Sequence, residues 1–401
     1  MGFADLGLAP QAIQIAPLRG AFGKTLQPRV PDCMRAYLGN PVLSDPGAPV
    51  WVAASGVQPS NLERAGEARF LVHQARFHIG DTLWLTPLLR QIRRRFPAAR
   101  TTVVAPPAGL PVLAGNPHVT EIVPYAPPAA RRGVLERLAG RRFDVALFAF
   151  ARRPESRWLA KAVDARHRVN LEYFDPALDS RRLPPWLTHE GWFVWGAMPS
   201  PRMLLHALDP FLPPELRGTW TEEDRRVEIH LSPEDHRQAQ EALTARGIAG
   251  EPYAVIAPGG YSSRRWPAER FARLASRLAV ELGLHVLVEG SPAEVPLLAK
   301  VAARAADRRV LAAADPLRVF AALLERARLL VANDSAPIHL AEAAGTPTVY
   351  FAQREKLVHS RPAGDLCRAL HDERENDLRR ITVEQAFAAV SSALQPAIFI
   401  R

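Results

Sequence analysis

From residue 69 onward, two patterns of apolar and polar residues alternate along the chain. Short apolar runs, such as 70–72 and 101–105, have the length of buried strands. Between them lie segments whose apolar residues stand three and four positions apart. The first of these segments begins at Asp81 and ends before Pro97, and its apolar residues are Leu85, Leu88, Leu89, Ile92 and Phe96. That spacing predicts a helix with one apolar face.

The alternation of strands and helices occurs twice and predicts two parallel sheets, each covered by helices on both faces. The first set of strands is expected at 70–72, 101–105, 120–123 and 144–150, and the second at 253–257, 285–289, 309–311, 329–332 and 348–351. Residues 175–230 interrupt the rhythm, and there we expect a helix near Gly191–Leu208 and a linker at 210–225. The predicted fold class is therefore α/β, with two doubly wound, Rossmann-like domains facing across a cleft.

The division of the chain follows from the same pattern. Residues 1–65 are rich in proline and glycine, and we expect them to form an extension that wraps or caps the first domain. The first domain is expected over 66–215 and the second over 216–401. In doubly wound sheets ligands bind beyond the carboxyl ends of the strands, so the turns from strand to helix are the candidate sites.

Composition narrows the function classes. The 401 residues are 48% hydrophobic and 23% charged, which excludes a disordered chain. The net charge of +10 suits acidic substrates or an anionic membrane surface. Nucleic acid is not expected as a partner, because no zinc finger, aromatic RNP motif or long basic run occurs. Arginines cluster at 90–95 and 131–142, and this predicts a possible peripheral contact with the cytoplasmic membrane.

No run of about 18 apolar residues and no signal-peptide pattern is present, so a cytoplasmic location is expected. The two cysteines, Cys33 and Cys367, form no CxxC pair, and the chain has no HExxH pattern. We therefore expect neither a metal site nor a cofactor.

The turn at 76–83 follows the first strand and precedes the first amphipathic helix. Gly80 allows a tight turn, and Asp81 stands at the predicted helix start. Two roles are open for this aspartate. It caps the free backbone N–H groups of the helix, or it serves as a general base at the mouth of the cleft.

The turn at 257–267 joins the first strand of the second domain to a helix. It concentrates groups that suit an anion beside a helix N-terminus, namely Gly259, Gly260, Ser262, Ser263 and Arg264. Phosphate binding is favoured over a merely solvated loop. The GxxxxGK[ST] pattern of a P-loop is absent.

The turn at 331–340 reads Val-Ala-Asn-Asp-Ser-Ala-Pro-Ile-His-Leu. Asp334 or Ser335 is positioned to cap the following helix, and the backbone N–H groups of Ser335 and Ala336 are positioned to meet a diphosphate. His339 lies five residues after Asp334, where a structural role is the alternative to ligand binding.

Together these turns resemble glycosyltransferase family 9, the heptosyltransferase family. The resemblance rests on four segments in register: 76–90, 116–124, 257–267 and 333–340. It implies a GT-B architecture and a metal-independent, inverting transfer. It also implies Asp81 as the catalytic base. Acceptor-side residues are then His78, Gly80 and Thr82, and donor-side residues are Gly259, Gly260, Ser262, Ser263, Arg264, Glu289, Asp334, Ser335, Ala336 and His339.

The resemblance further implies a nucleotide-sugar donor, with ADP-heptose favoured, and a glycan or lipid-linked glycan as acceptor. The chain departs from the family pattern at Ala336, where a glycine is usual, and at 351–354, where Phe-Ala-Gln-Arg replaces Phe-Gly-Pro-Thr. The second departure removes a glycine and a hydroxyl and adds a cation. A nucleotide-sugar epimerase or hydrolase and a non-catalytic sugar-binding protein stay open as alternatives.

Overall fold

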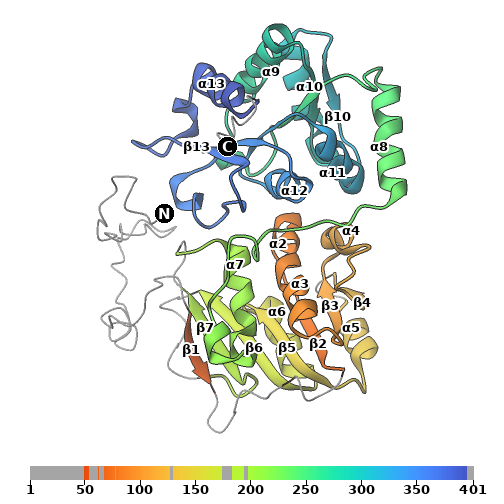
Figure 1. Ribbon diagram of the computed structural model, residues 1–401, viewed down its shortest axis with the longest axis vertical. Helices are drawn as coiled ribbons and strands as arrows, with labels where there is room; N and C mark the ends of the chain where they lie inside the picture. The colour runs from red at the N-terminus through yellow and green to blue at the C-terminus, as the bar shows by residue number, and fades with distance from the viewer. Residues whose placement is uncertain are drawn as a thin grey trace, which may run out of the picture.

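The computed structural model describes residues 49–53, 62, 67–76, 78–126, 130–173, 183–193 and 197–394. Most of the predicted extension at 1–65 lies outside these residues. Two α/β domains are stacked along the long axis of the molecule and joined by a segment that runs between them (Figure 1). We call the part from β1 to α7 the N-terminal domain and the part from α8 to α13 the C-terminal domain.

The N-terminal domain is built on a seven-stranded sheet in the order β1-β7-β6-β5-β2-β3-β4. Its strands are β1 (Val50–Ala53), β2 (Arg69–His73), β3 (Arg100–Ala105), β4 (Glu121–Pro124), β5 (Phe143–Ala149), β6 (Ala165–Tyr173) and β7 (His189–Phe193). Its helices are α2 (Ile79–Leu83), α3 (Thr86–Arg95), α4 (Leu110–Leu113), α5 (Arg131–Leu138), α6 (Pro154–Ala162) and α7 (Ser200–Leu205). β1 pairs antiparallel with β7, whereas the other neighbours run parallel.

The C-terminal domain is built on a six-stranded parallel sheet in the order β10-β9-β8-β11-β12-β13. Its strands are β8 (Tyr253–Ala257), β9 (His285–Glu289), β10 (Val310–Ala313), β11 (Leu330–Asn333), β12 (Thr348–Phe351) and β13 (Cys367–Leu370). Its helices are α8 (Pro233–Ala245), α9 (Ala268–Leu282), α10 (Val295–Ala305), α11 (Leu317–Arg326), α12 (Ala336–Ala344) and α13 (Val383–Leu394).

Both sheets have the same doubly wound topology. The order β4-β3-β2-β5-β6-β7 and the order β10-β9-β8-β11-β12-β13 each read 3-2-1-4-5-6 along the chain. The winding reverses between β2 and β5 in one domain and between β8 and β11 in the other. At such a switch point the connections leave in opposite directions and open a crevice, which is where these folds bind ligands. The turns after β2 and β8 therefore start at equivalent positions.

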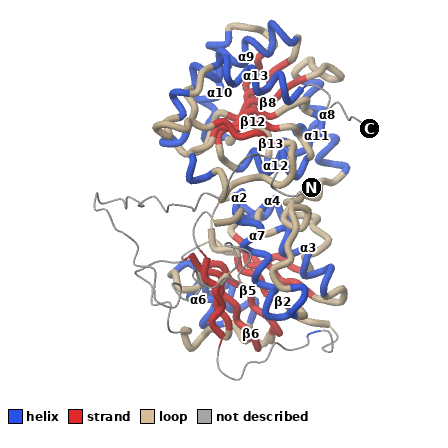
Figure 2. The backbone as a smooth tube through the Cα atoms, turned by 60° about the vertical axis from the view of Figure 1, so that its left-hand side comes forward, coloured by secondary structure: helices blue, strands red, loops and turns tan. Residues whose placement is uncertain are grey.

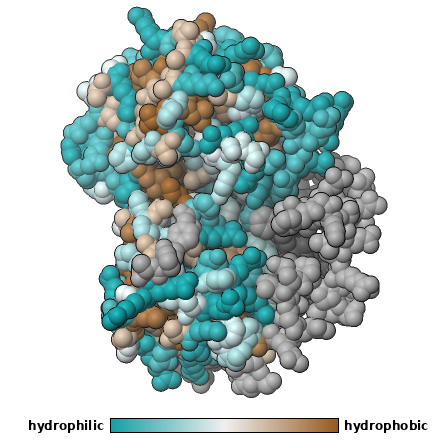
Figure 3. Space-filling model, turned by 180° about the vertical axis from the view of Figure 1, so that it is seen from behind, coloured by the Kyte–Doolittle hydropathy of each residue, from teal (hydrophilic) through white to brown (hydrophobic). Residues whose placement is uncertain are grey.

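Helices cover both faces of each sheet, and the apolar core forms a layer on either face (Figure 2). One layer of the C-terminal domain also takes up Leu83 from α2 and Val112 from α4. Helices α2 and α12 are in contact across the junction. Hydrophobic side chains gather at this narrow junction between the two lobes in the view from behind (Figure 3). The two domains thus share apolar packing, which fixes how their switch points face each other.

The predicted helix near Gly191–Leu208 is wrong at its start. His189–Phe193 forms strand β7, and the helix is the shorter α7. All five residues of β7 are buried, because β1 and β6 flank the strand and both of its faces are covered. A strand buried on both faces loses the polar–apolar alternation that would distinguish it from a helix. Trp195 of the predicted helix lies outside the described residues.

The predicted helix from Asp81 to Phe96 is two helices. α2 begins at Ile79, two residues before Asp81, and the chain bends at Trp84 and Leu85 before α3 begins at Thr86. Pro87 stands in the first turn of α3, where proline is tolerated because its missing N–H has no partner there. Among the described helices, none is long and apolar enough to cross a membrane.

Candidate active site

A cavity of about 1030 Å³ lies where the two switch points meet. Residues of turns from both domains line it: 75, 76 and 78–81 after β2, the turn after β5, 257, 259–261 and 264 after β8, and 334–337, 339 and 340 after β11. Its volume is at the upper end of the range for small-molecule sites. The cavity is therefore bounded by the carboxyl ends of the strands at which each sheet reverses.

Asp81 enters this cavity from the N-terminal domain. It is the third residue of α2, only 8% exposed, and the N-cap position belongs to His78, which makes no side-chain capping bond. The capping role considered for Asp81 is therefore wrong. Its Oδ1 lies 3.6 Å from Arg76 Nη1. Burial raises the pKa of the Asp81 carboxyl, and Arg76, His78 and His339 oppose that shift without cancelling it.

The loop that carries Arg76 is held by several side chains. Gln74 Nε2 donates to the carbonyl of Asp81 over 2.7 Å, while Gln74 Oε1 accepts from the N–H of Arg76 over 2.9 Å. The guanidinium of Arg76 stacks over the ring of Phe150 at 4.3 Å. Phe150 has a φ of 64°, a left-handed conformation that non-glycine residues rarely adopt and that recurs at functional sites. These contacts aim a cation and an aromatic ring into the cavity.

The turn after β8 brings the chain of the C-terminal domain close to α10 and to the turn after β11. A side chain at Gly259 would place its Cβ 2.1 Å from Glu294 Oε1. Gly260 has a φ of 104°, and a Cβ there would lie 3.3 Å from Ser335 Cβ. The Gly260 N–H donates to Glu294 Oε1 over 2.9 Å. Both glycines are thus required by the fold of this loop.

The two arginines of this turn differ. Arg264 lines the cavity, and its guanidinium stacks 4.5 Å above the ring of Tyr261. Arg265 does not line the cavity. Its Nε donates to the Gly260 carbonyl over 2.7 Å and its Nη2 lies 3.8 Å from Glu294 Oε1, so it supports the loop. Tyr261 also reaches the other domain, through a 2.7 Å hydrogen bond between its hydroxyl and His78 Nε2.

Asn333 joins the second and third turns. Its Nδ2 donates to the carbonyls of Pro258 and Gly259, and its Oδ1 accepts from the N–H of Trp266. The next residue, Asp334, lines the cavity, and burial raises the pKa of its carboxyl against the opposing effects of His339, Lys356 and Arg264. The N-cap of α12 is Ser335, although its hydroxyl donates to the Asn333 carbonyl and not to the helix.

His339 lies at the contact between the domains. Its Nε2 accepts a 3.0 Å hydrogen bond from Trp84 Nε1, and its Nδ1 lies 3.4 Å from Glu342 Oε2. Because the indole N–H only donates, Nε2 must be the unprotonated nitrogen in this arrangement. Both His339 and Trp84 line the cavity. The histidine thus combines the structural role considered for it with a position at the site.

Glu289 ends β9 at the far end of the cavity. Burial raises the pKa of this carboxyl to about 8, although the hydrogen bond from the backbone N–H of Asp315 opposes the shift. Glu289 Oε1 accepts from the N–H of Asp315 over 2.7 Å. Among the described residues, Oε2 has no hydrogen-bond partner. A buried oxygen of this kind is suited to a hydroxyl group of a ligand.

The cavity brings together eleven of the fourteen residues expected at the site. These are His78, Gly80, Asp81, Gly259, Gly260, Arg264, Glu289, Asp334, Ser335, Ala336 and His339. Three do not line it. Thr82 is fully buried on the far side of α2 against Gly109, while Ser262 and Ser263 are exposed in a short 3₁₀ turn.

Lys356 is a cavity residue that the sequence analysis did not identify. It lies two residues after Arg354, the cation noted at the departure from the family pattern. Arg354 does not line the cavity, and its Nη1 donates to the Glu373 carbonyl over 3.1 Å. Burial lowers the pKa of Lys356, and Arg264 lowers it further, so the two cations stand near each other. In the sequence, the altered segment after β12 was the signal for a cation at the site. It pointed to Arg354, whereas the residue that lines the cavity is Lys356.

Residues 220–382 match the model of glycosyltransferase family 9, described as heptosyltransferase. This part of the chain is therefore similar to a glycosyltransferase family 9 domain. The match covers the second and third turns and confirms the family resemblance and the glycosyltransferase class. Among curated proteins, none matches the chain in sequence.

Solved glycosyltransferase structures share the fold of both domains. A family 9 glycosyl transferase from Veillonella parvula is 21% identical, with a TM-score of 0.66 over 82% of this chain and 97% of that one. The ADP-heptose lipopolysaccharide heptosyltransferase II of E. coli is 19% identical, with a TM-score of 0.63 over 82% and 98%. E. coli heptosyltransferase WaaC with ADP is 16% identical, with a TM-score of 0.62 over 81% and 99%. These likenesses confirm the two-domain GT-B architecture.

Proposed function

We propose that the protein transfers a sugar from a nucleotide-sugar donor to a hydroxyl acceptor, with inversion at the anomeric carbon. One observation carries this proposal. The buried carboxylate of Asp81 and the cations Arg264 and Lys356 approach one cavity from opposite domains. A base on one side and positive charge on the other are what a displacement with an anionic leaving group requires.

The donor is expected to lie in the C-terminal domain, with its diphosphate beside Gly259, Gly260 and the start of α12. Backbone N–H groups at a helix N-terminus favour anions. Arg264 and Lys356 add the charge that Mg²⁺ supplies in many other enzymes of phosphate chemistry, so we propose a transfer that needs no metal at the reacting centre. Glu289 is positioned to accept a hydrogen bond from a hydroxyl of the nucleotide sugar.

ADP-heptose is the favoured donor. The family description names heptosyltransferase, and two of the similar structures are named for ADP-heptose or for a complex with ADP. In the reaction, the acceptor oxygen forms a bond to the anomeric carbon as its proton passes to Asp81. The bond from that carbon to the diphosphate breaks, and its electron pair leaves with the diphosphate. The transition state has oxocarbenium character, as in glycoside hydrolysis.

The acceptor is expected beside Asp81 in the N-terminal domain. Arg76 and Arg153 line that side of the cavity, which suits an acceptor that carries negative charge. A glycan or lipid-linked glycan that carries acidic groups meets this requirement. Peripheral membrane contact is part of the same proposal, and sedimentation with anionic vesicles at low and high salt tests it, since electrostatic binding is lost as salt is added.

A panel of nucleotide sugars tests the donor. A donor that binds the folded protein raises its melting temperature, and we expect ADP-heptose to do so more than UDP- or GDP-sugars at equal concentration. Incubation with ADP-heptose alone is the companion experiment. Rapid epimerisation or hydrolysis without an acceptor would favour the isomerase or hydrolase alternative. Adding Mg²⁺ to chelator-treated protein should leave the transfer rate unchanged.

A further inference from the structure

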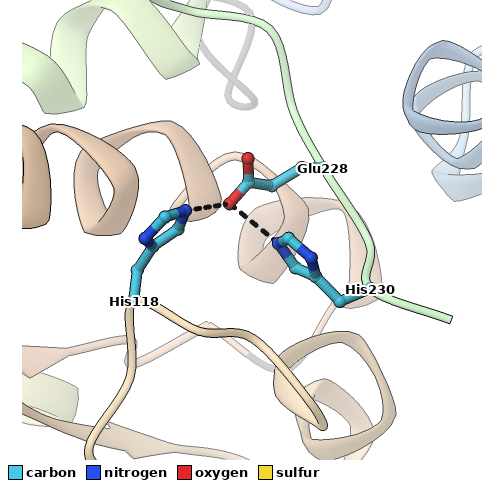
Figure 4. Close-up of side chains that lie close together, drawn as sticks. All are labelled: His118, Glu228 and His230. Carbon is cyan, nitrogen blue, oxygen red and sulfur yellow. Dashed lines mark hydrogen bonds and ion pairs between the residues drawn. The ribbon is translucent and has the colours of Figure 1, made fainter. Parts of the chain in front are cut away.

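Three side chains that can bind a metal ion meet outside the cavity, at the segment that joins the domains. His118 lies in the turn between α4 and β4, whereas Glu228 and His230 lie in the stretch that leads to α8 (Figure 4). Their ligand atoms all lie within 4.8 Å of one another. None of the three lines the cavity. The cluster is thus separate from the proposed transferase site.

The distances within the cluster suit a small transition-metal ion. Glu228 Oε1 lies 3.3 Å from His118 Nε2 and 3.2 Å from His230 Nε2. Zinc binds imidazole nitrogen and carboxylate oxygen at about 2.0–2.1 Å, so two ligand atoms at tetrahedral positions stand about 3.3 Å apart. The two nitrogens already flank the oxygen at that separation, and both histidine rings point toward it (Figure 4).

The three ligands are held in place independently of one another. The backbone N–H of His118 donates to Asn116 Oδ1 over 2.9 Å, and the backbone N–H of Glu228 donates to Thr86 Oγ1 over 2.9 Å. The third ligand is held through its carbonyl, which accepts from Arg318 Nη2 over 2.7 Å. Because each backbone is fixed, little chain entropy remains to be lost when an ion binds.

Arg90 selects the oxygen that faces the histidines. Its Nη1 donates to Glu228 Oε2 over 2.7 Å, and its Nη2 donates to the carbonyls of residues 223, 224 and 226. The outer oxygen is thereby occupied, and Oε1 is the one turned toward the imidazoles. Groups that orient a ligating carboxylate in this way are typical of metal sites, where they tune affinity.

We propose that His118 Nε2, Glu228 Oε1 and His230 Nε2 bind one divalent transition-metal ion such as Zn²⁺, with water as the fourth ligand. Two imidazoles and one carboxylate suit zinc or cobalt, whereas magnesium and calcium take oxygen ligands. The sequence offered no sign of this site, because Glu228 lies 110 positions after His118. The ion would fasten the joining segment to the N-terminal domain.

Titration of the chelator-treated full-length protein with Co²⁺ and Zn²⁺ tests the site. We expect one Co²⁺ per chain with the visible absorption of a tetrahedral ion, displacement by Zn²⁺, and a rise in melting temperature on binding. His118→Gln and His230→Gln should each weaken binding at least about tenfold, and the double variant should abolish it. The matched control is His236→Gln, because His236 also pairs with a carboxylate, Glu325, over 2.8 Å.

Circular dichroism and the melting temperature without metal show whether each variant is folded. The proposal is overturned if the wild-type protein shows no saturable binding of either ion. It is also overturned if the folded double variant binds Co²⁺ like the wild type, or if His236→Gln weakens binding as much as the paired variants. None of these outcomes bears on glycosyl transfer, so the metal site and the proposed function fail independently.

Discussion

Each domain places an aspartate in a turn at its switch point, but the two turns follow different strands of the shared topology and the surroundings of the two residues differ. Asp81 follows the first strand of one sheet, and Asp334 follows the fourth strand of the other. Burial raises the pKa of both carboxyls. Asp81 has Arg76 as its ion-pair partner, whereas Asp334 lies near His339, Lys356 and Arg264.

Topology and chemistry account for different features of these two aspartates. The doubly wound fold brings a turn to each switch point, which accounts for two buried aspartates in one cavity. Arg264 and Lys356 lie near Asp334, where a diphosphate would need positive charge. Asp81 is left on the side of the attacking hydroxyl. We therefore assign proton transfer to Asp81 and assign Asp334 to the electrostatics of the donor site.

The largest expected effect comes from Asp81→Asn. Removing a general base should lower kcat by about 10²–10⁴-fold, while donor binding measured by thermal shift stays near that of the wild type. Asp334→Asn is the matched variant and should lower kcat less, because Asp334 lies on the donor side and takes no proton from the acceptor. If Asp334→Asn abolishes transfer and Asp81→Asn is mild, the two roles are reversed.

The donor side is tested by its two neighbouring arginines. Arg264→Ala should raise KM and lower kcat, with a loss of about 2–4 kcal/mol, or roughly 30- to 1000-fold in kcat/KM, because a charge-assisted contact to the leaving group is removed. Arg264→Lys should recover part of that loss. Arg265→Ala, which removes the contacts with the Gly260 carbonyl and Glu294 that support the loop, should lose far less. Equal losses of kcat/KM for Arg264→Ala and Arg265→Ala would contradict the assignment of Arg264 to the donor and of Arg265 to the loop.

The C-terminal domain was the more predictable of the two. Its strands 253–257, 285–289 and 348–351 agree with the sequence pattern, because each apolar run has strand length and is bounded by turn or helix residues. In the N-terminal domain, β7 escaped prediction because it is buried on both faces. The bend at Trp84 escaped because helical spacing continues through it.

The residues of the candidate site also differ in whether the sequence could identify them. The glycines and Arg264 could be identified because they stand together in one short turn after a strand. Lys356 could not, since its position depends on how the chain turns after β12. Contacts between domains, such as that of Tyr261 with His78, were equally hidden, because no local pattern records which turns of the two sheets will meet.

A smaller effect is expected from Trp84→Phe. The change keeps an aromatic ring but removes the N–H that donates to His339 Nε2 across the domain junction. Loss of one such hydrogen bond costs about 1 kcal/mol, or roughly fivefold in kcat/KM. Trp158→Phe is the control, because the Trp158 indole donates to the Glu155 carbonyl within its own helix. An unchanged kcat/KM for Trp84→Phe shows that this hydrogen bond contributes nothing to the site.

The smallest expected effects are those of the two aspartates on the pH dependence of stability. A carboxyl whose pKa is raised in the folded state binds more protons there than in the unfolded chain, so the free energy of unfolding falls as pH rises through that interval. At neutral pH, the burial of the Asp81 and Asp334 carboxyls therefore opposes folding. Asp81→Asn and Asp334→Asn should therefore raise the melting temperature near pH 7, and the gain should vanish below the ordinary pKa of aspartate. A melting temperature lowered at pH 7 by Asp81→Asn contradicts this account, because it would mean that the ion pair with Arg76 outweighs the cost of burial.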